Sequence, residues 1–212
     1  MTTKIKPLAP LPIEFNEEAH TYLYLPTGER MGTSVTGVCS VNKSAAALRN
    51  IERHKASWEP RGLHAHSALE HNLRGLPFEV NPVYAEWVAP MLAHPFWETF
   101  EPIAVEYRLV DLKRGIGGSF DALGYDHFAG GKLILLDLKT QSSAMYGVYS
   151  TDAQMGGYLS MLLDRHHLTV DECLTVWARP GECLVGDPQD PKECLAEWEQ
   201  TYEKWLNLQE QI

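Results

Sequence analysis

The chain has 212 residues, and its 28 acidic and 18 basic side chains give a formal net charge of −10. Hydrophobic residues make up 44% and are spread evenly, which excludes a disordered chain, a collagen-like repeat and a coiled coil. The acidic balance excludes loose coating of nucleic acid by charge alone, although basic residues gathered in one groove can still bind it. No apolar run approaches the ~20 residues that span a bilayer, so we expect no membrane contact.

The first half of the chain predicts mainly helices. Residues 1–12 contain three prolines and predict a loosely held arm, and residues 20–31 predict a β-hairpin, followed by a short extended piece at 34–36. A helical subregion is expected over 44–93. Its predicted helices cover residues 44–58, residues 60–73 before Gly75 and Pro77, and a segment that starts at Asn81-Pro82.

The second half predicts a sheet with further helices. Alternating or continuous apolar patterns predict strands at residues 103–110, around 119–123, at 132–139 and at 174–178. Helices are predicted over 152–165 and 190–210, the latter with Asp190 as N-cap. The element order predicts one domain with an α/β (α+β) fold, in which helices flank a central mixed sheet and residues 103–178 form the core.

Two carboxylates interrupt apolar strands. Asp137 lies among leucines and isoleucine, where an unpaired charge is costly, and Lys139 projects to the same face of an extended strand. Asp121 precedes Asp137 by 16 residues, the interval that neighbouring strands joined by Gly130-Gly131 require. Two acids and a lysine on one sheet face are typical of metal-dependent phosphodiester hydrolysis. The alternative is a structural Asp–Lys pair at a strand end.

Further motifs occur in a specific order over residues 62–158, about half the chain. They are Gly62-x-x-x-His66 followed by Leu69-Glu70, Val105-Glu106, Gly118-Ser-Phe-Asp121, Asp137-Leu-Lys139 and Gln154-x-x-x-Tyr158. This series resembles the PD-(D/E)XK nuclease superfamily in its RecB-like and Cas4-like branch. The segments His20-x-Tyr22 and Ser34-Val-Thr-Gly-Val38 are similar to those that precede the core in mitochondrial genome maintenance exonucleases and phage RecB-like nucleases.

The resemblance implies a restriction-endonuclease-like core and a DNA nuclease, with an exonuclease favoured, that serves repair, recombination or phage DNA processing. Metal-activated water would hydrolyse the phosphodiester and leave a 5′-phosphate. The implied metal ligands are His66, Asp121, Asp137 and the carbonyl of Leu138. Lys139 would be the catalytic lysine, with Glu106 as a further acidic residue, and Gln154 and Tyr158 would support the site or contact the DNA backbone. Oxygen ligands with one imidazole suit Mg²⁺ or Mn²⁺ better than zinc.

Each of these residues also has a structural interpretation. His66 shares a helix face with Leu63, Leu69 and Leu73 and can be a core histidine. Glu106 can be a surface charge on an edge strand, and Tyr158 a core aromatic residue with a bonded hydroxyl. Two rival functions stay open: a non-catalytic nucleic-acid-binding or recombination partner on the same fold, and a hydrolase of small phosphate esters. Digestion polarity, strand preference and oligomeric state are not determined by the sequence.

The cysteines raise the question of an iron–sulfur cluster, which some relatives hold on one cysteine before the core and three after it. Here the order matches, with Cys39 before and Cys173, Cys183 and Cys194 after. The later three are 10 and 11 residues apart and include no CxxC pair. We therefore expect free reduced thiols rather than a cluster, in a cytoplasmic protein of bacterial or phage origin. The N-terminus lacks the apolar stretch of a signal peptide.

DNA is the expected partner, and several side chains are candidates for its contact. Trp58 and Tyr146 can stack on unpaired bases. The basic candidates are Lys43, Arg49, Arg53, Lys55, Arg61, Arg108, Lys113 and Arg114. The alternative for these charges is an ordinary solvated helix face.

Overall fold

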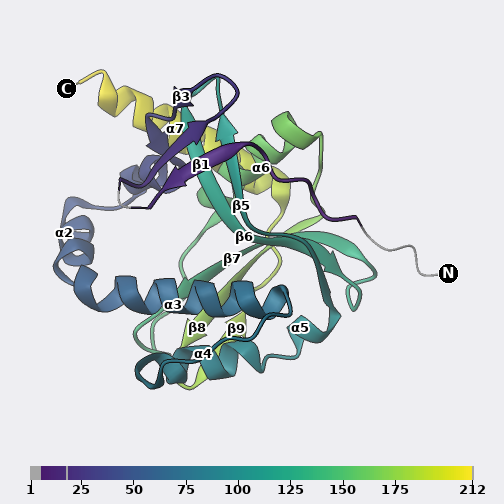
Figure 1. Ribbon diagram of the computed structural model, residues 1–212. Helices are drawn as coiled ribbons and strands as arrows, with labels where there is room; N and C mark the ends of the chain where they lie inside the picture. The colour runs from purple at the N-terminus through teal and green to yellow at the C-terminus, as the bar shows by residue number, and fades with distance from the viewer. Residues whose placement is uncertain (1–5, 18, 212) are drawn as a thin grey trace.

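The computed structural model describes residues 6–17 and 19–211 (Figure 1). Its centre is a mixed six-stranded sheet in the order β4-β6-β7-β8-β9, with β5 paired to β6. The pairs β4–β6 and β7–β8 are parallel, and the other pairs are antiparallel. The strands are β4 (Thr33–Ser34), β5 (Phe100–Asp111), β6 (Ile116–Asp126), β7 (Lys132–Thr140), β8 (Glu172–Arg179) and β9 (Glu182–Val185). The predicted mixed sheet is therefore confirmed.

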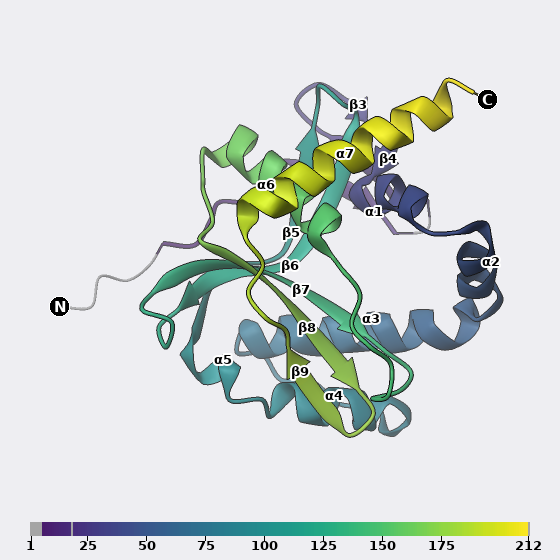
Figure 2. The same ribbon diagram turned by 180° about the vertical axis from the view of Figure 1, so that it is seen from behind.

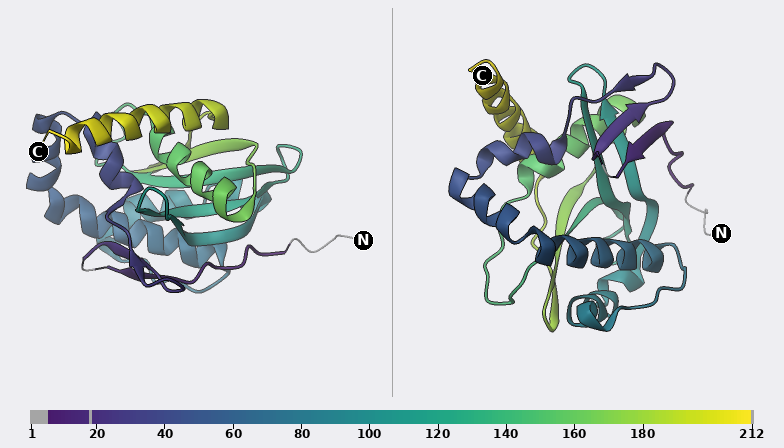
Figure 3. Two further views of the ribbon diagram at one scale, coloured as in Figure 1. Left: turned by 90° about the horizontal axis from the view of Figure 1, so that it is seen from above. Right: turned by 60° about the vertical axis from the view of Figure 1, so that its left-hand side comes forward.

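Helices cover both faces of this sheet. Seen from above, α6 and α7 lie on one side of it and α3 on the other (Figure 3, left). One core cluster joins the sheet to α1 (Val35–Cys39), α6 (Asp152–His166) and α7 (Pro191–Gln209). A second joins the opposite face to α3 (Lys55–Leu73) and α4 (Ala85–Leu92). The α+β architecture with flanking helices matches the prediction, and Figure 2, which views the molecule from behind, shows α7 in front of the upper ends of the strands.

The N-terminal part forms a small second sheet. Strands β1 (Ile13–Asn16), β2 (Thr21–Tyr24) and β3 (Glu29–Arg30) pair in that order. The predicted hairpin is confirmed as β2–β3. The predicted loose arm is wrong from residue 6 onward, because the Leu8 amide donates to the Ile103 carbonyl at 2.8 Å and the Leu8 side chain packs on the core. Residues 1–5 of that arm lie outside the described residues.

The helical subregion exists, but two of its boundaries differ from the prediction. Helix α2 (Ala45–Arg53) begins at the Ser44 cap and ends five residues early, and α3 begins at Lys55 rather than Pro60. Pro60 lies inside α3, where it costs one backbone hydrogen bond; the sequence pattern had suggested it as a helix start. The 3₁₀ helix η2 (Pro82–Tyr84) starts at the Asn81 cap as predicted, and the Asn81 side chain accepts from the Val83 amide.

The remaining elements connect these parts. The extended piece expected at 34–36 ends at Ser34, because the Ser34 hydroxyl accepts from the Gly37 amide and caps α1. A 3₁₀ helix, η1 (Ser40–Asn42), follows α1, and α5 (Phe96–Thr99) leads into β5. The predicted Asp190 cap of α7 is confirmed, with its carboxylate accepting from the Lys192 amide. No helix of the described residues combines the length and apolarity that crossing a membrane demands.

Candidate metal and catalytic site

Three acidic side chains occupy neighbouring positions on three adjacent strands. Val105 and Tyr107 of β5 pair with Ala122 and Phe120 of β6, so Glu106 stands across from Asp121. On the other side, the β6–β7 ladder ends at the pair Ala122–Leu136. The next step of that register would set Asp121 opposite Asp137. Strand pairing therefore brings together carboxylates that are 15 and 16 residues apart in the chain.

Asp121 lies where β6 and β7 stop pairing. Its Oδ2 accepts a hydrogen bond from the Leu138 amide at 2.5 Å. Leu138 lies two residues beyond Leu136, the last residue of β7 that pairs with β6. The carboxylate thus satisfies an amide of β7 that has lost its partner strand. Leu138 itself is fully buried, and its amide orients Asp121. The other oxygen of Asp121, Oδ1, is free to contact His66.

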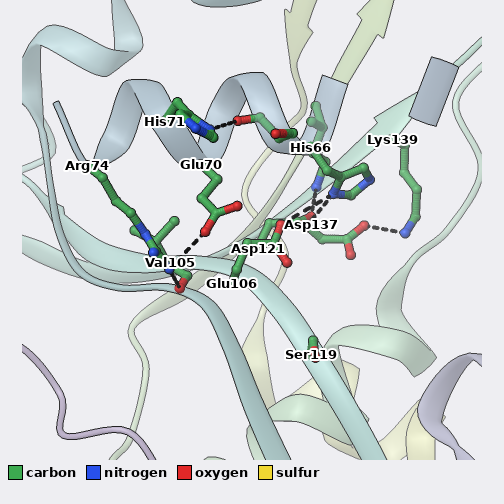
Figure 4. A network of polar contacts seen from close by, with 12 residues as sticks. His66, Glu70, His71, Arg74, Val105, Glu106, Ser119, Asp121, Asp137 and Lys139 are labelled. Atoms are coloured by element: carbon green, nitrogen blue, oxygen red, sulfur yellow. Dashed lines mark hydrogen bonds and ion pairs between the residues drawn. The ribbon is translucent and has the colours of Figure 1, made fainter. Parts of the chain in front are cut away.

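His66 reaches this carboxylate from α3. Its Nδ1 lies 2.6 Å from Asp121 Oδ1 and 3.8 Å from Glu106 Oε1. The potential ligand atoms of His66, Glu106 and Asp121 all lie within 4.8 Å of one another. Figure 4 shows the three side chains converging beneath α3, next to Asp137 and Lys139. Glu106 lies on the edge strand β5, as its surface-charge interpretation expects, but its carboxylate is only partly exposed and faces His66.

Glu106 has an unusual backbone. Its φ is 49°, in the left-handed region, although it lies within β5. A side chain other than glycine pays roughly 1–2 kcal/mol for this conformation. The strain accompanies the position that aims a carboxylate at His66, as is common where a site needs a specific side-chain direction.

Asp137 and Lys139 form the second half of the site. Lys139 Nζ lies 2.6 Å from Asp137 Oδ2, which is buried but receives no well-directed hydrogen bond. The other oxygen, Oδ1, accepts from Gln154 Nε2 of α6 at 2.6 Å. Asp137 is not one of the three residues of the His66 cluster. Strand alternation predicted that Asp137 and Lys139 share one face of β7, and the ion pair confirms it.

Tyr158 supports the site from behind. Its side chain is 3% exposed, and its hydroxyl accepts from Gln154 Nε2 at 3.1 Å. One amide group therefore donates both to Asp137 and to Tyr158. Direct contact of Tyr158 with a substrate, one of the two expected roles, does not fit this burial. The structure places Tyr158 as a support for Gln154.

Burial and neighbouring charges act against each other throughout the site. Burial lowers the pKa of the His66 imidazole, but Asp121 and Glu106 outweigh it and raise that pKa to about 10. For Asp137 burial dominates, helped by the charge of Asp121, and its pKa is raised despite Lys139. Burial disfavours the Lys139 ammonium, yet Asp137 holds its pKa above the usual range. Both cations of the site are therefore protonated at neutral pH in the absence of metal.

This donor set fits a hard divalent cation. Two carboxylates and an imidazole offer the oxygen-rich ligation of Mg²⁺ or Mn²⁺, and the buried Asp137 Oδ2 adds an oxygen without a directed donor. Adjacent ligands of an octahedral Mg²⁺ lie about 3.0 Å apart, from metal–oxygen distances of about 2.1 Å. The 2.6 Å contact between His66 Nδ1 and Asp121 Oδ1 would therefore lengthen if both atoms bound one cation. Without a cation, the His66 proton bridges the two atoms.

The faces of α3 differ from the expectation in one respect. Leu63, expected beside His66 on a buried face, is 68% exposed. The buried residues of α3 are instead Arg61, Ala65, Ala68 and Leu69, and His66 lies at the margin of that face. A position at the margin lets the imidazole reach Asp121, where β6 and β7 stop pairing, whereas a central position would bury the imidazole against the sheet.

Arg74 is a contributor that the motif analysis missed. Its Nη2 lies 3.0 Å from Glu70 Oε1 and donates to the Val105 carbonyl at 3.1 Å (Figure 4). Because Val105 precedes the strained Glu106, this link ties α3 to β5 beside the site. The i,i+4 spacing of Glu70 and Arg74 was the available sequence signal.

The basic residues expected to contact DNA separate into two groups. Arg108 lies over the Phe15 ring, while Lys113 and Arg114 pair with Asp164 and Glu199. These three have contacts within the protein, although Arg108 and Lys113 are also exposed. The residues of α2 are exposed, as are Lys55 and Tyr146. Trp58 is 36% exposed, and its indole donates to the Ile51 carbonyl.

The four cysteines are free thiols: Cys39 lies in α1, Cys173 in β8, Cys183 in β9 and Cys194 in α7. Cys173 and Cys194 belong to the core cluster beneath α6 and α7, and Cys39 packs against it. Cys183 packs against the cluster on the opposite face.

Neither a protein-family model nor a curated protein matches this chain. Among solved structures, the crystal structure of SSO0001 is similar over 46% of this chain and 48% of that chain, with 19% identity and a TM-score of 0.29. The chain thus covers about half the length of that structure. A likeness this weak carries no argument about function.

Proposed function

We propose that the protein is a divalent-metal-dependent DNA nuclease, an exonuclease of the RecB-like and Cas4-like branch of the PD-(D/E)XK superfamily with its restriction-endonuclease-like core. The observation that carries the proposal is the cluster of His66, Glu106 and Asp121 beside the Asp137–Lys139 ion pair. These residues come from four elements, α3, β5, β6 and β7, and their order in the chain is that of the superfamily motifs.

The side chains have separable roles in this proposal. His66, Glu106, Asp121 and Asp137, with the Leu138 carbonyl, would hold Mg²⁺ or Mn²⁺. The cation, when bound, would neutralise phosphate charge and lower the pKa of water. Lys139 stays an ammonium because Asp137 raises its pKa, so it acts as a donor to the phosphate or the attacking water and not as a base. Gln154 fixes Asp137, and Tyr158 fixes Gln154.

DNA is the substrate we propose, and the exposed basic residues of α2 and the start of α3 are the candidates for contact with its backbone. Arg49 and Arg53 are exposed, and Lys55 has a single solvent-exposed partner in Glu59, 3.5 Å away. Such pairs are weak and can exchange a carboxylate for a phosphate. We place the reaction in the cytoplasm, where four thiols stay reduced.

Cleavage assays with end-labelled linear and circular DNA, single- and double-stranded, test the proposal. We expect degradation of linear DNA with Mg²⁺ or Mn²⁺ and none with chelator. Asp137→Asn and Lys139→Met should each reduce the rate by at least about 100-fold. Lys132→Met is the matched control, since Lys132 lies at the other end of β7 in a surface pair with Glu172.

Four outcomes contradict the proposal in different ways. DNA binding without metal-dependent cleavage would favour a non-catalytic nucleic-acid-binding protein. Turnover of mononucleotides but not of polymers would favour a phosphate-ester hydrolase. Wild-type cleavage by the Asp137→Asn or Lys139→Met protein would refute the assigned site. Cleavage of the circular substrates would replace the exonuclease with an endonuclease.

A further inference from the structure

Arg61 is a buried arginine without a carboxylate partner. Its residue is 7% exposed, and no acidic oxygen of the described residues lies within 4.0 Å of its guanidinium, since Arg61 belongs to none of the ion pairs. Its Nε has a long contact of 3.5 Å with Thr140 Oγ1. Burial lowers the pKa of the guanidinium, and the Tyr84 phenol acts weakly in the opposite direction.

Arg179 at the end of β8, also buried, shows what a satisfied guanidinium looks like in this protein. Arg179 is also 7% exposed, but its Nε donates to Gln141 Oε1 at 2.8 Å and its Nη1 pairs with Glu182 at 3.0 Å. In place of these partners Arg61 has the long Thr140 contact and the face of Trp87, 5.2 Å from its carbon Cζ. A cation–π contact offsets part of the cost of burying a charge but uses none of the N–H donors.

The unused donors of Arg61 are not sealed. Among the described residues, the buried side-chain nitrogen or oxygen atom without a partner is Asp137 Oδ2 alone, so the Nη atoms of Arg61 keep some contact with solvent. The guanidinium is therefore held by its face and its stem, and its remaining N–H groups are not completely shut off from solvent. Two N–H groups of the planar fork can bind two oxygens of a phosphate in a bidentate manner.

Arg61 lies at the end of β7 that carries Asp137 and Lys139. Thr140, which Arg61 contacts, directly follows Lys139 and is three residues beyond Asp137, about 10 Å along an extended strand, but its side chain projects to the opposite face of β7, beneath α3. Trp87, which supports the guanidinium, is itself held by its indole N–H to the Gln141 carbonyl at 2.7 Å. A nucleic-acid strand with one phosphate at Asp137 and Lys139 would reach Arg61 by passing around this end of β7.

We propose that Arg61, stacked on Trp87, binds the non-bridging oxygens of an internucleotide phosphate next to the one that is cleaved. The inference rests on the proposed nuclease function and adds a residue that sets the register of the strand. Arg61 is then a substrate-binding residue whose charge the bound phosphate compensates, which explains why the protein supplies no carboxylate.

A phosphate-neutralisation experiment tests this inference. DNA substrates carry a single neutral methylphosphonate at successive linkages around the cleaved bond, and the Arg61→Gln protein is compared with the wild type. At one neighbouring linkage we expect the wild-type rate to fall about 10- to 100-fold, as for loss of a charge-assisted hydrogen-bonded pair. The Arg61→Gln protein should lose a similar factor on normal DNA and almost nothing more on that substrate.

Two controls separate binding from folding. Arg30→Gln removes the same charge from β3 of the small sheet and should leave the rates unchanged. Arg61→Gln should unfold at the same temperature as the wild type or higher, because it removes an uncompensated buried charge, whereas a structural arginine would lower the midpoint. If Arg61→Gln does not fold, Arg61→Lys replaces it, because lysine keeps the charge but loses the paired N–H groups of the guanidinium. In this variant the methylphosphonate at the neighbouring linkage should reduce the rate less than it does in the wild type.

The outcomes also separate this inference from the proposed function. If the wild type cleaves DNA and Arg61→Gln is equally active, or remains equally sensitive at every methylphosphonate linkage, the inference is wrong and the nuclease stands. If no metal supports cleavage, the nuclease is wrong, and DNA affinity measured with chelator decides about Arg61. Equal affinity of the wild type and Arg61→Gln for normal DNA would then overturn the inference as well.

Discussion

His66 Nδ1 on α3 lies 2.6 Å from Asp121 Oδ1 on β6, although 55 residues separate them in the chain. The contact joins the helical layer to the strands at the point where β6 and β7 part. It also places a proton between two carboxylates, since Glu106 Oε1 lies 3.8 Å from the same nitrogen. Metal binding at this cluster must displace that proton.

The protonated His66 predicts how the stability of the metal-free protein depends on pH. Its pKa is about 10 in the folded chain and near 6.5 when unfolded. A group whose pKa is higher in the folded state stabilises that state fully at pH values below its unfolded pKa. This stabilisation is lost as the pH rises through the folded pKa. With chelator present, we expect the unfolding midpoint to fall between pH 6.5 and pH 10, and His66→Gln to flatten that fall. The effect is moderated because about a third of the imidazole is exposed.

Thermal unfolding followed by circular dichroism at a series of pH values measures this dependence. His127→Gln is the control, because His127 pairs with Glu101 on the surface. An equally steep fall in the His66→Gln protein would assign the pH dependence to other groups and contradict the protonated bridge.

The strained backbone of Glu106 predicts an inversion of the usual order of alanine and glycine. In an ordinary strand, alanine is more stable than glycine by about 0.5–1 kcal/mol. At φ 49°, glycine pays no steric penalty and alanine does. Both variants lose the carboxylate, so their difference reports the backbone alone. We expect Glu106→Gly to be more stable than Glu106→Ala by about 1 kcal/mol in urea denaturation with chelator.

The same substitutions at Glu101, which lies in β5 without a positive φ, give the reference order. If Glu106→Ala proved the more stable of the pair, Glu106 would have an ordinary extended backbone.

Gln154 is expected to act by positioning Asp137 and not by binding DNA. Gln154→Leu removes the donor to Asp137 Oδ1, which is 2.6 Å away, and leaves a buried carboxylate oxygen unsatisfied. We expect kcat to fall roughly 10- to 100-fold, as for other residues that orient metal ligands, with KM for DNA nearly unchanged. Tyr158→Phe keeps the ring and should have a smaller effect in the same direction.

Steady-state cleavage rates over a range of DNA concentrations separate the two constants. A raised KM with unchanged kcat would instead show that Gln154 contacts the substrate, which is the other role expected from the sequence.

Gly156 holds the α6–α7 contact that supports Gln154. A Cβ atom at this position would overlap the carbonyl oxygen of Cys194 in α7. Because that obstacle is backbone, the helices would have to separate, and we expect Gly156→Ala to destabilise by at least about 2 kcal/mol. Gly147→Ala is the control, since nothing lies within 4 Å of its added methyl group and its φ is not left-handed. A stable Gly156→Ala protein in urea denaturation would refute the close packing.

The sequence by itself indicated most of the elements and named the residues that the structure brings together at the candidate site. The 16-residue interval around Gly130-Gly131 indicated that Asp121 and Asp137 lie on neighbouring strands joined by a turn. In the structure both glycines adopt the positive φ of that turn. Alternation placed Lys139 on the face of Asp137. These inferences depend on local geometry, which the chain carries within a few residues.

Only the tertiary structure decided which side chains meet and where helices end. The separation of β6 and β7, the left-handed Glu106 and the pairing of His66 with Asp121 are features that no local pattern encodes. The tertiary structure also admits Pro60 into α3 and buries Arg61 without a carboxylate, although the sequence favoured a helix start and a solvated charge there. Contacts between distant segments can outweigh local preferences because each preference is worth about 1 kcal/mol or less.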